Sequence, residues 1–540
     1  MLKGKELIKN AIKLQPVERI PWVPFVGCHA ATLLGITATE YLKSADNIVS
    51  GITKAIELYQ PDGIPVIFDL QLEAEALGCD ITWADNNPPA VTGHILTNGT
   101  KLSELKIPDK NSGRVPIAIE ATKKLRELHP DIALYGLITG PFTLTLHLLG
   151  TDIFMKMLEA PDEVIKIISF AGKVAKSMAH YYIEAGCDVI AVVDPMTSQI
   201  DPMMFEQFVT PTATDLFEFI RKQNAYSSFF VCGHAEQNIE VMCQCKPDNI
   251  SIDENNSLDY VKGIALDHKI SFGGNLKLTV VLLMGTEEES QAHALECMDQ
   301  GGKTGFILAP GCDLPMSTPP ENIKAITSLI HDTYQQEVIR AREKSESSIE
   351  LLNMKDYGAA NKVIVDIITL DSESCAPCQY MVEAVKHVAP HFEGLVEWRE
   401  HAIKKMEAVS FMNSLMVKNI PTICIDGKIA FVSQIPPKQK LIDAIQVRIN
   451  EKLKHIILSK NAEVTIITDD EQKVDNLKKN IETAMKETGK HYKINIVTDQ
   501  TIHLRYGVSD LPAVILTEHK IKSQGEIPKS EIIREWLKDL

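Results

Sequence analysis

The sequence predicts an α/β protein in which a (β/α)8 TIM barrel is followed by two smaller α/β domains. Short apolar runs alternate with helical patterns from about residue 15 to residue 335, which is typical of parallel strands joined by helices. Eight runs are strand-like, and most of them carry β-branched or aromatic residues and end at Gly, Pro, Asp or Cys: 20–26, 63–69, 132–138, 188–194, 227–232, 249–253, 270–275 and 305–310. An open doubly wound sheet is the alternative that the same alternation allows.

Two further strand–helix units follow the barrel. Strands at 362–370 and at 463–469 each open the same β-α-β-α-β-β-α pattern. The stretch between the barrel and the first of these units is charged and contains "ESSIE", which indicates a helix running into a linker. The expected division of the chain is a barrel over residues 1–345, a linker over 346–360, and α/β domains over 361–455 and 460–540.

The composition excludes some classes of partner. The formal net charge is −17, and an acidic surface repels the phosphate backbone of a nucleic acid. No run approaches the ~18 apolar residues of a membrane span, and the N-terminal stretch lacks the apolar core of a signal peptide. The eleven cysteines sit in a large chain with ample core residues, which favours reduced thiols over a disulfide scaffold. We expect a cytoplasmic protein with no nucleic-acid or membrane partner.

Polar residues directly after the barrel strands mark the expected site, because catalytic residues of such barrels lie at the carboxyl ends of strands. They are Cys28, His29, Asp69, Asp194, Cys232, His234 and Cys312. Among them, a Cys, a His and a distant Cys form a set that suits Zn²⁺, and three protein ligands leave one coordination position open. The alternative is that each cysteine is a buried packing residue. Cys243 and Cys245 could also supply ligands, but they follow a helical run and are expected at the opposite end of the barrel.

Motifs along residues 5–335 resemble a known superfamily. They include "PWVPFVGCHAATLLG", "FDLQLEAEALGCDI", "LITGPFTLTLHLLG", "FFVCGHAEQNIEVM" and "LAPGCDLPMSTPPENIKA", in that order. They are similar to the uroporphyrinogen decarboxylase superfamily, and within it to the methylcobamide:thiol (coenzyme M) methyltransferases. The resemblance implies a (β/α)8 barrel and a zinc ion held by His-x-Cys and a later Cys. It also implies that the methyl group comes from a methyl-corrinoid carried on a partner corrinoid protein.

The resemblance implies which residues bind the metal, and this sequence differs from the family pattern at one of them. Cys232 matches the Cys of His-x-Cys-Gly, and Cys312 matches the later Cys. Phe230 stands where the family has His, and we expect His234, two residues beyond Cys232, to take its place. His29, Glu73 or another carboxylate could also complete the shell.

Four further residues are candidates for the pocket. Asp69 matches the pyrrole-binding Asp of the decarboxylases, and His147 stands where those enzymes have Tyr. We expect Asp69 and His147 to be catalytic and His29 and Asp194 to bind the cofactor, with a hydrogen-bonding framework role as the alternative for each. The arginine-rich stretch of the decarboxylases corresponds here to "FVGCHAATLLG", which has no arginine.

The segment 361–452 resembles thioredoxins and glutaredoxins. "ESCAPCQYM" places Cys375 and Cys378 after a strand and at the start of a helix, where a thiolate is stabilised, so we expect Cys375 to be a low-pKa nucleophile and Cys378 to resolve the mixed disulfide. Pro421 precedes a later strand, where these folds carry a cis-proline facing the CxxC. The alternative is a zinc knuckle completed by His387 and His391. Residues 461–540 resemble a second such fold with Pro512 but no CxxC.

Together these resemblances imply a zinc-dependent methyltransferase with an attached thiol–disulfide redox module. The methyl acceptor would be a small thiol or a pterin. The CxxC would keep the zinc-site thiolates or a thiol substrate reduced. The alternatives are a tetrapyrrole enzyme of the decarboxylase type and a non-catalytic protein that handles redox equivalents or corrinoids.

Overall fold

The computed structural model forms two compact units, residues 1–442 and 443–540. It describes residues 3–341, 357, 362–370, 372–373, 375–392, 394–403, 408, 411–412, 414–415, 417, 419–460, 463–498, 511–516, 520–524 and 527–538. The barrel and the first small domain share the first unit, whereas the sequence divides them. Apart from Tyr357, the predicted linker lies outside the described residues, so the domain boundaries stay predictions. None of the helices in these ranges is long and apolar enough to cross a membrane.

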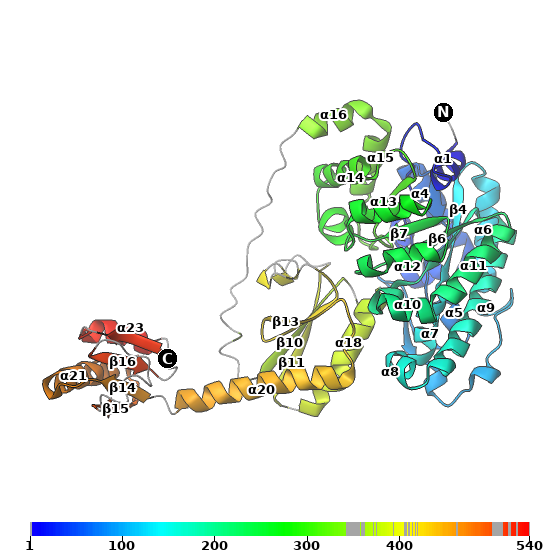
Figure 1. Cartoon of the computed structure of the whole chain (residues 1–540). Coiled ribbons are helices and arrows are strands. Elements are labelled where there is room, and N and C mark those ends of the chain that lie inside the picture. Colours follow the sequence, from blue (N-terminus) through cyan, green and yellow to red (C-terminus); the bar gives the residue numbers. More distant parts are fainter. Residues whose placement is uncertain are drawn as a thin grey trace. The chain divides into compact units, whose positions relative to one another are not determined.

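The barrel of the first unit is a curled parallel sheet (Figure 1). Its strands follow one another in chain order: β1 (Gly63–Pro65), β4 (Ala133–Thr139), β5 (Val189–Val193), β6 (Tyr226–Val231), β7 (Asn249–Ile252), β8 (Ser271–Leu276) and β9 (Phe306–Pro310). The predicted first strand contributes a single bridge, Trp22 to Leu308 of β9. The carbonyl of Trp22 also accepts a hydrogen bond from the N–H of Asp62, 2.9 Å away, beside β1. This segment therefore joins β9 to β1 and closes the sheet, which confirms the barrel.

Helices cover the outside of the sheet. The longer ones are α1 (Gly4–Ile12), α4 (Ala45–Tyr59), α6 (Val115–Leu128), α7 (Pro141–Leu149), α8 (Asp152–Glu159), α9 (Pro161–Ala185), α11 (Thr210–Lys222), α13 (Leu258–Asp267), α14 (Glu287–Gly301), α15 (Pro320–His331) and α16 (Thr333–Ala341). The shorter ones are α2 (His29–Leu34), α3 (Ala38–Leu42), α5 (Leu72–Ala76), α10 (Pro202–Phe208) and α12 (Ile239–Gln244). A hairpin of β2 (Asp80–Thr82) and β3 (Ala90–Gly93), which the sequence analysis missed, extends from the loop after β1.

Alternate residues of each strand face the inside and the outside of the barrel. On β4, Leu134 and Ile138 pack against the helices, whereas Tyr135 and Leu137 belong to the interior cluster. Phe230 and Cys232 also belong to that interior cluster. The side chain of Cys232 therefore lies on the inner face, directly beyond Phe230.

The first small domain has the thioredoxin-like topology that the sequence predicts. Its sheet has the order β11 (Val396–Ala402), β10 (Val363–Thr369), β12 (Thr422–Ile425) and β13 (Lys428–Val432), with β10 and β11 parallel and the other pairs antiparallel. Helix α18 (Ala376–Val388) follows β10, and α20 (Lys438–Lys460) follows β13.

Helix α18 packs on the barrel. The ring of Tyr380 is fully buried, with its centroid 6.0 Å from that of His94. The Gln379 amide donates a hydrogen bond of 2.5 Å to the carbonyl of Val91 in β3. A third contact comes from the backbone N–H of Ile435, which donates to the side chain of Gln199 at 3.0 Å.

The second unit repeats the topology with its own core. Its sheet has the order β15 (Lys493–Val497), β14 (Glu463–Ile467), β16 (Ala513–Leu516) and β17 (Lys520–Gln524), flanked by α21 (Glu471–Thr488) and α23 (Ser530–Lys538). Leu477 of α21 and Ile533 of α23 pack against Val464 and Ile466 of β14. The unit contains no cysteine, so it lacks the thiol chemistry of the first small domain.

Candidate functional site

A cavity of about 250 Å³ lies at the carboxyl ends of the barrel strands within the first unit. The loops after β6, β7 and β9 contribute Cys232, Asp253, Glu254 and Cys312 to its wall. The first thioredoxin-like domain contributes Cys375, Cys378 and Pro421. The site thus combines polar groups from three barrel strands with the CxxC, and it lies at the end of the barrel where the sequence analysis placed it.

Cys232 and Cys312 meet at the centre of this wall. Their Sγ atoms are 2.9 Å apart, although 80 residues separate them in the sequence. Two thiolates on one tetrahedral zinc, each at about 2.3 Å from the metal, would lie about 3.8 Å apart. The hydrogen bond with Cys312 raises the pKa of the Cys232 thiol, and burial raises it further. A bound cation would oppose both effects.

Glu254 is a buried carboxylate in the wall of the same cavity as the thiol pair. Its Oε1 accepts a hydrogen bond from the N–H of Leu278 at 3.1 Å, whereas the buried Oε2 has no hydrogen-bond partner among the described residues. A Cβ on Gly311, the residue before Cys312, would lie only 2.2 Å from that Oε2. Burial raises the pKa of Glu254 to about 8, and the nearby charge of Asp253 adds to the rise. Glu254 was not among the residues expected at the site, although its place directly after the strand 249–253 was the available signal.

Asp253 organises the loop that carries Cys232. Its Oδ2 accepts a hydrogen bond of 2.5 Å from the N–H of Gly233, and its Oδ1 accepts one of 2.8 Å from the Asn256 amide. Burial raises the pKa of Asp253 to about 6. These bonds fix the backbone immediately after Cys232.

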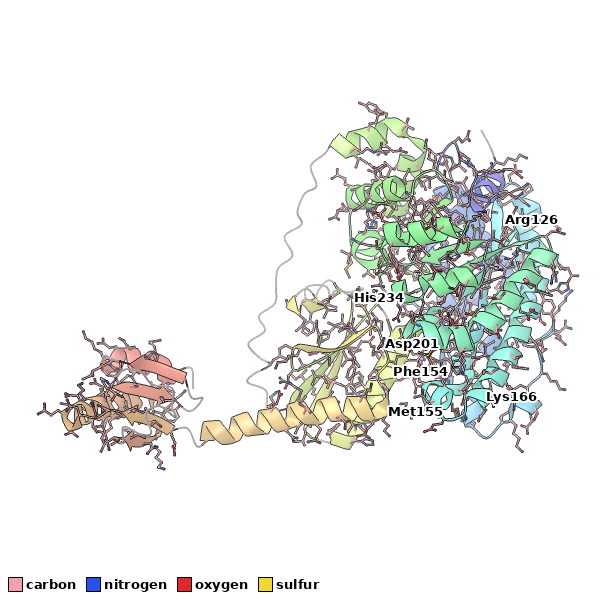
Figure 2. The ribbon with its side chains drawn as sticks, in the orientation of Figure 1. Arg126, Phe154, Met155, Lys166, Asp201 and His234 are labelled. Atoms are coloured by element: carbon pink, nitrogen blue, oxygen red, sulfur yellow. The ribbon has the colours of Figure 1, made fainter. Side chains whose placement is uncertain are left out.

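The structure does not bring His234 to the thiol pair. His234 lies at the rim of the barrel (Figure 2), and it does not line the cavity. Its Nδ1 is 3.2 Å from the backbone carbonyl of Asn255. Phe230, at the position of the missing His, packs inside the barrel with its ring centroid 4.8 Å from that of Phe25. In the described part of the chain, no three His, Cys, Asp or Glu side chains are already clustered as metal ligands.

Asp69 lies outside the cavity and is paired. Its Oδ2 is 2.7 Å from Nη1 of Arg114, and both side chains are buried. Arg114 also donates from Nε to Glu75 at 2.6 Å, and the Asp69 Oδ1 accepts from the N–H of Gln71 at 2.9 Å. The ion pair is what the framework alternative for Asp69 would require, and its expected catalytic role stays a prediction.

His29 and Asp194 also lie outside the cavity lining. Both ring nitrogens of His29 have partners, the Tyr59 hydroxyl at 2.7 Å and the Met316 carbonyl at 3.2 Å, and burial lowers its pKa to about 4. Asp194 accepts hydrogen bonds from the N–H of Phe142 at 3.1 Å and of Thr143 at 2.7 Å, in the first turn of α7. Helix-terminal N–H groups need such acceptors. These hydrogen bonds agree with a framework role for both side chains, and their expected cofactor binding stays a prediction.

His147 lies where the barrel meets α18, away from the cavity. Its ring centroid is 6.5 Å from that of Tyr380, and its Nδ1 is buried without a hydrogen-bond partner among the described residues. Burial lowers the pKa of His147 to about 3, and the neighbouring His94 contributes to the shift. The structure therefore assigns His147 to the contact between the two domains.

The CxxC occupies the position that the sequence predicts, with one difference. Cys375 is the N-cap of α18, and Cys378 accepts a hydrogen bond of 3.4 Å from the N–H of Leu370. Pro421 follows a cis peptide bond and lines the cavity together with both cysteines. The expected low pKa of Cys375 is wrong, because its hydrogen bond with Cys378 raises the pKa well above the usual value and burial adds to the rise.

The remaining candidate thiols and imidazoles lie elsewhere. Cys424 of β12 is buried in the core of the first thioredoxin-like domain. His387 and His391 are exposed near the far end of α18, which argues against a zinc knuckle with the CxxC at its start. Cys243 and Cys245 are buried among the helices outside the sheet, at and just after the end of α12.

Comparison with known protein families agrees with this architecture. Residues 3–333 match the family Uroporphyrinogen decarboxylase (URO-D), and residues 462–538 match a thioredoxin domain. The chain belongs to the uroporphyrinogen decarboxylase family. This confirms the resemblance that the motifs indicate.

Individual relatives indicate the branch of the family to which this chain is similar. The chain is 26% identical over 329 residues to the methylcobamide:CoM methyltransferase MtbA of Methanosarcina acetivorans, covering 59% of this chain and 95% of that protein. It is 25% identical over 338 residues to the methylcobamide:CoM methyltransferase MtaA of Methanosarcina barkeri, covering 61% and 98%. The uroporphyrinogen decarboxylase of Geobacter sulfurreducens is 23% identical over 337 residues, covering 60% and 97%.

A solved structure supports the same branch. The structure of a methyltransferase from Methanosarcina mazei superposes with a TM-score of 0.57 at 25% sequence identity, covering 62% of this chain and all of that one. The barrel of this family member is therefore close to the methylcobamide:CoM methyltransferases and carries a C-terminal thioredoxin domain in addition.

Proposed function

We propose that this protein transfers a methyl group between a corrinoid on a partner protein and a thiol or pterin acceptor, at a zinc site that includes Cys232 and Cys312. The observation that carries the proposal is the meeting of these two sulfur atoms, 2.9 Å apart, at the carboxyl ends of the barrel strands. The methylcobamide:CoM methyltransferases MtbA and MtaA align over 95% and 98% of their lengths, and the barrel is the part that they share with this chain.

The residues at the site suit a zinc ion. Thiolate and carboxylate are both zinc ligands in proteins. Cys232 and Cys312 would hold the ion. Glu254 would be the third protein ligand, in place of His234, which the sequence suggested. The evidence for Glu254 is its buried, unpartnered Oε2 beside Gly311. A zinc ion here would lower the pKa of a bound acceptor thiol, or polarise the acceptor nitrogen of a pterin.

The protein groups around the thiols would position the reactants and exclude water. The hydrogen bonds of Asp253 hold the loop that carries Cys232. Phe68, Leu278 and Leu283 contribute apolar walls to the cavity, and apolar walls suit a methyl group and displace water. The first thioredoxin-like domain provides part of the wall through Pro377 and Pro421.

Two observations favour methyl transfer over tetrapyrrole decarboxylation. Among the described residues that line the cavity there is no arginine or lysine to neutralise the carboxylates of a porphyrinogen. Asp69, which the decarboxylases use to bind pyrrole nitrogens, is buried in its ion pair with Arg114. A polyanionic substrate would therefore meet a site without compensating charge.

Elemental analysis of anaerobically purified protein tests the proposal. We expect about one zinc per chain, lost in Cys312→Ala and weakened in Glu254→Gln, because each substitution removes a ligand. Cys243→Ala is the matched control, since it removes a buried cysteine outside the cavity. His234→Ala should keep its zinc. Methyl transfer from methylcobalamin to a thiol would be followed in the same preparations by the change in corrinoid absorbance.

Three outcomes would contradict the proposal. Zinc retained by Cys312→Ala would show that the thiol pair is not the metal site. Release of CO₂ from uroporphyrinogen by metal-free protein would favour the decarboxylase alternative. Protein that binds no metal and transfers no methyl group, yet reduces insulin disulfides, would favour a non-catalytic barrel with a redox module.

A further inference from the structure

Two pairs of cysteines from different domains share one cavity. Cys232 and Cys312 belong to the barrel, and Cys375 and Cys378 belong to the first thioredoxin-like domain. The proposed methyl transfer uses the first pair and leaves the second without a role. A CxxC at the start of a helix is a thiol–disulfide exchange motif, so the nearest sulfur atoms are its natural reaction partners.

We propose that the first thioredoxin-like domain is a resident reductase for the barrel, in which the CxxC reduces a disulfide formed between Cys232 and Cys312. This activity goes beyond methyl transfer and does not depend on it. It requires only that the barrel pair can be oxidised and that the CxxC can reach it.

The barrel pair is placed for oxidation. A separation of 2.9 Å between the Sγ atoms lies between the about 2.05 Å of a disulfide and the about 3.8 Å of two thiolates on one zinc. Movement of less than about 1 Å would reach either state. Cys232 is 8% exposed and Cys312 is partly buried, so a bulky reductant from solution would have restricted access to the pair. A CxxC that lines the same cavity would not have to enter from solution.

The docking of α18 brings the CxxC to the pair. The buried ring of Tyr380, one turn after Cys375, packs beside His94 of the barrel. The hydrogen bond from Gln379 to Val91 fixes the same turn of the helix. Cys375 is near enough to the barrel pair for the charge on Cys312 to raise the pKa of Cys375 and for the charge on Cys375 to raise the pKa of Cys232. A tethered dithiol acts at an effective concentration in the millimolar range or above.

The exchange balances in two steps. Cys375 attacks Sγ of Cys312 and its proton passes to the departing sulfur, so that the Cys312–Cys375 bond forms while the Cys232–Cys312 bond breaks and Cys232 leaves as a thiol. Cys378 then attacks Cys375, which closes the Cys375–Cys378 disulfide and releases Cys312. Two electrons pass from the CxxC to the barrel pair. A peroxide would supply the preceding oxidation, and a dithiol reductant would return the CxxC to its reduced form.

Disulfide mapping on the full chain tests the exchange. Protein freed of metal with a chelator would receive one equivalent of hydrogen peroxide, be quenched with acid at intervals, and be digested for mass spectrometry without reduction. In the wild type we expect a Cys232–Cys312 disulfide to appear first and a Cys375–Cys378 disulfide to replace it. In Cys378→Ser the second step is blocked, so the Cys312–Cys375 mixed disulfide should accumulate. In Cys375→Ser the Cys232–Cys312 disulfide should persist about tenfold longer or more, because the tethered attacking thiol is gone.

Two results would overturn the proposal. One is a wild-type protein in which the Cys232–Cys312 disulfide persists while the CxxC thiols stay free. The other is Cys378→Ser protein without a Cys312–Cys375 cross-link. Neither measurement uses a corrinoid or a methyl acceptor, so failure of the exchange would leave the proposed methyl transfer untouched.

Discussion

Replacing Arg114 with Met should lower the free energy of unfolding of the barrel, because it leaves the buried carboxylate of Asp69 without its ion-pair partner. The guanidinium lies 2.7 Å from Asp69, and the two side chains are 7% and 0% exposed. At that distance (2.7 Å), and at an effective dielectric constant of about 20, two unit charges attract by about 6 kcal/mol before desolvation is subtracted. Removal of one partner from such a pair costs about 3–5 kcal/mol of unfolding free energy. That loss is a fifth or more of the stability of an ordinary domain, which is about 5–15 kcal/mol.

Urea unfolding near neutral pH, followed by tryptophan fluorescence, would measure the loss. Trp83 is a local reporter, since its ring centroid lies 4.7 Å from the guanidinium of Arg114. The double variant Asp69→Asn with Arg114→Met should recover most of the stability, because the fully buried charge of Asp69 is gone and Glu75, the other partner of Arg114, is 26% exposed. Arg340→Met is the matched control. Its partner Asp299 is 49% exposed, and we expect a change of about 0.5 kcal/mol or less.

Two results would refute this reasoning. Arg114→Met with an unfolding free energy within about 1 kcal/mol of wild type would show that the pair behaves like an exposed one. Asp69→Asn with normal stability and a methyl-transfer rate reduced about a hundredfold or more would show that Asp69 takes part in the chemistry as an acid or base.

Two further predictions concern buried framework residues. His147 has a pKa of about 3 when folded. Since an unfolded His takes up its proton near pH 6.5, stability present above that pH is lost on acidification, by about 2 kcal/mol between neutral pH and pH 5. Urea unfolding of His147→Leu at both pH values should lack this component, and an unchanged pH dependence would contradict the assignment. Asp194→Ala should lower the unfolding free energy by about 3 kcal/mol, because it leaves the N–H groups of Phe142 and Thr143 without an acceptor. Thermal unfolding would check this, and a loss below about 0.5 kcal/mol would show that those groups find other partners.

The strand–helix alternation was enough to predict the barrel, because the period of apolar residues directly reports which faces are buried. The position of Cys232 was predictable for the same reason, since a residue just after a strand lies at the rim. The pairing of Cys232 with Cys312 required the family resemblance, because 80 residues separate them.

Partners that come from other parts of the chain could not be predicted from local pattern. Asp69 looks like a site residue until Arg114 is placed beside it, and nothing in the sequence near either residue indicates that pairing. The loop after β6 turns His234 toward the carbonyl of Asn255, which no residue count reveals. The contact of Tyr380 with the barrel depends on how the surfaces of two domains fit together, so it too could not be predicted from the sequence.

Phe25, Phe68 and Phe230 form a cluster of edge-on and tilted rings that has a consequence for the proposed methyl transfer. The three rings and Cys232 belong to one buried cluster that fills the barrel interior, so access to the sulfur atoms is from the carboxyl ends of the strands. If the proposed methyl transfer takes place there, the acceptor and the corrinoid protein would approach the sulfur atoms from the same side. The acceptor would then bind before the corrinoid protein, and the methylated product would leave after it.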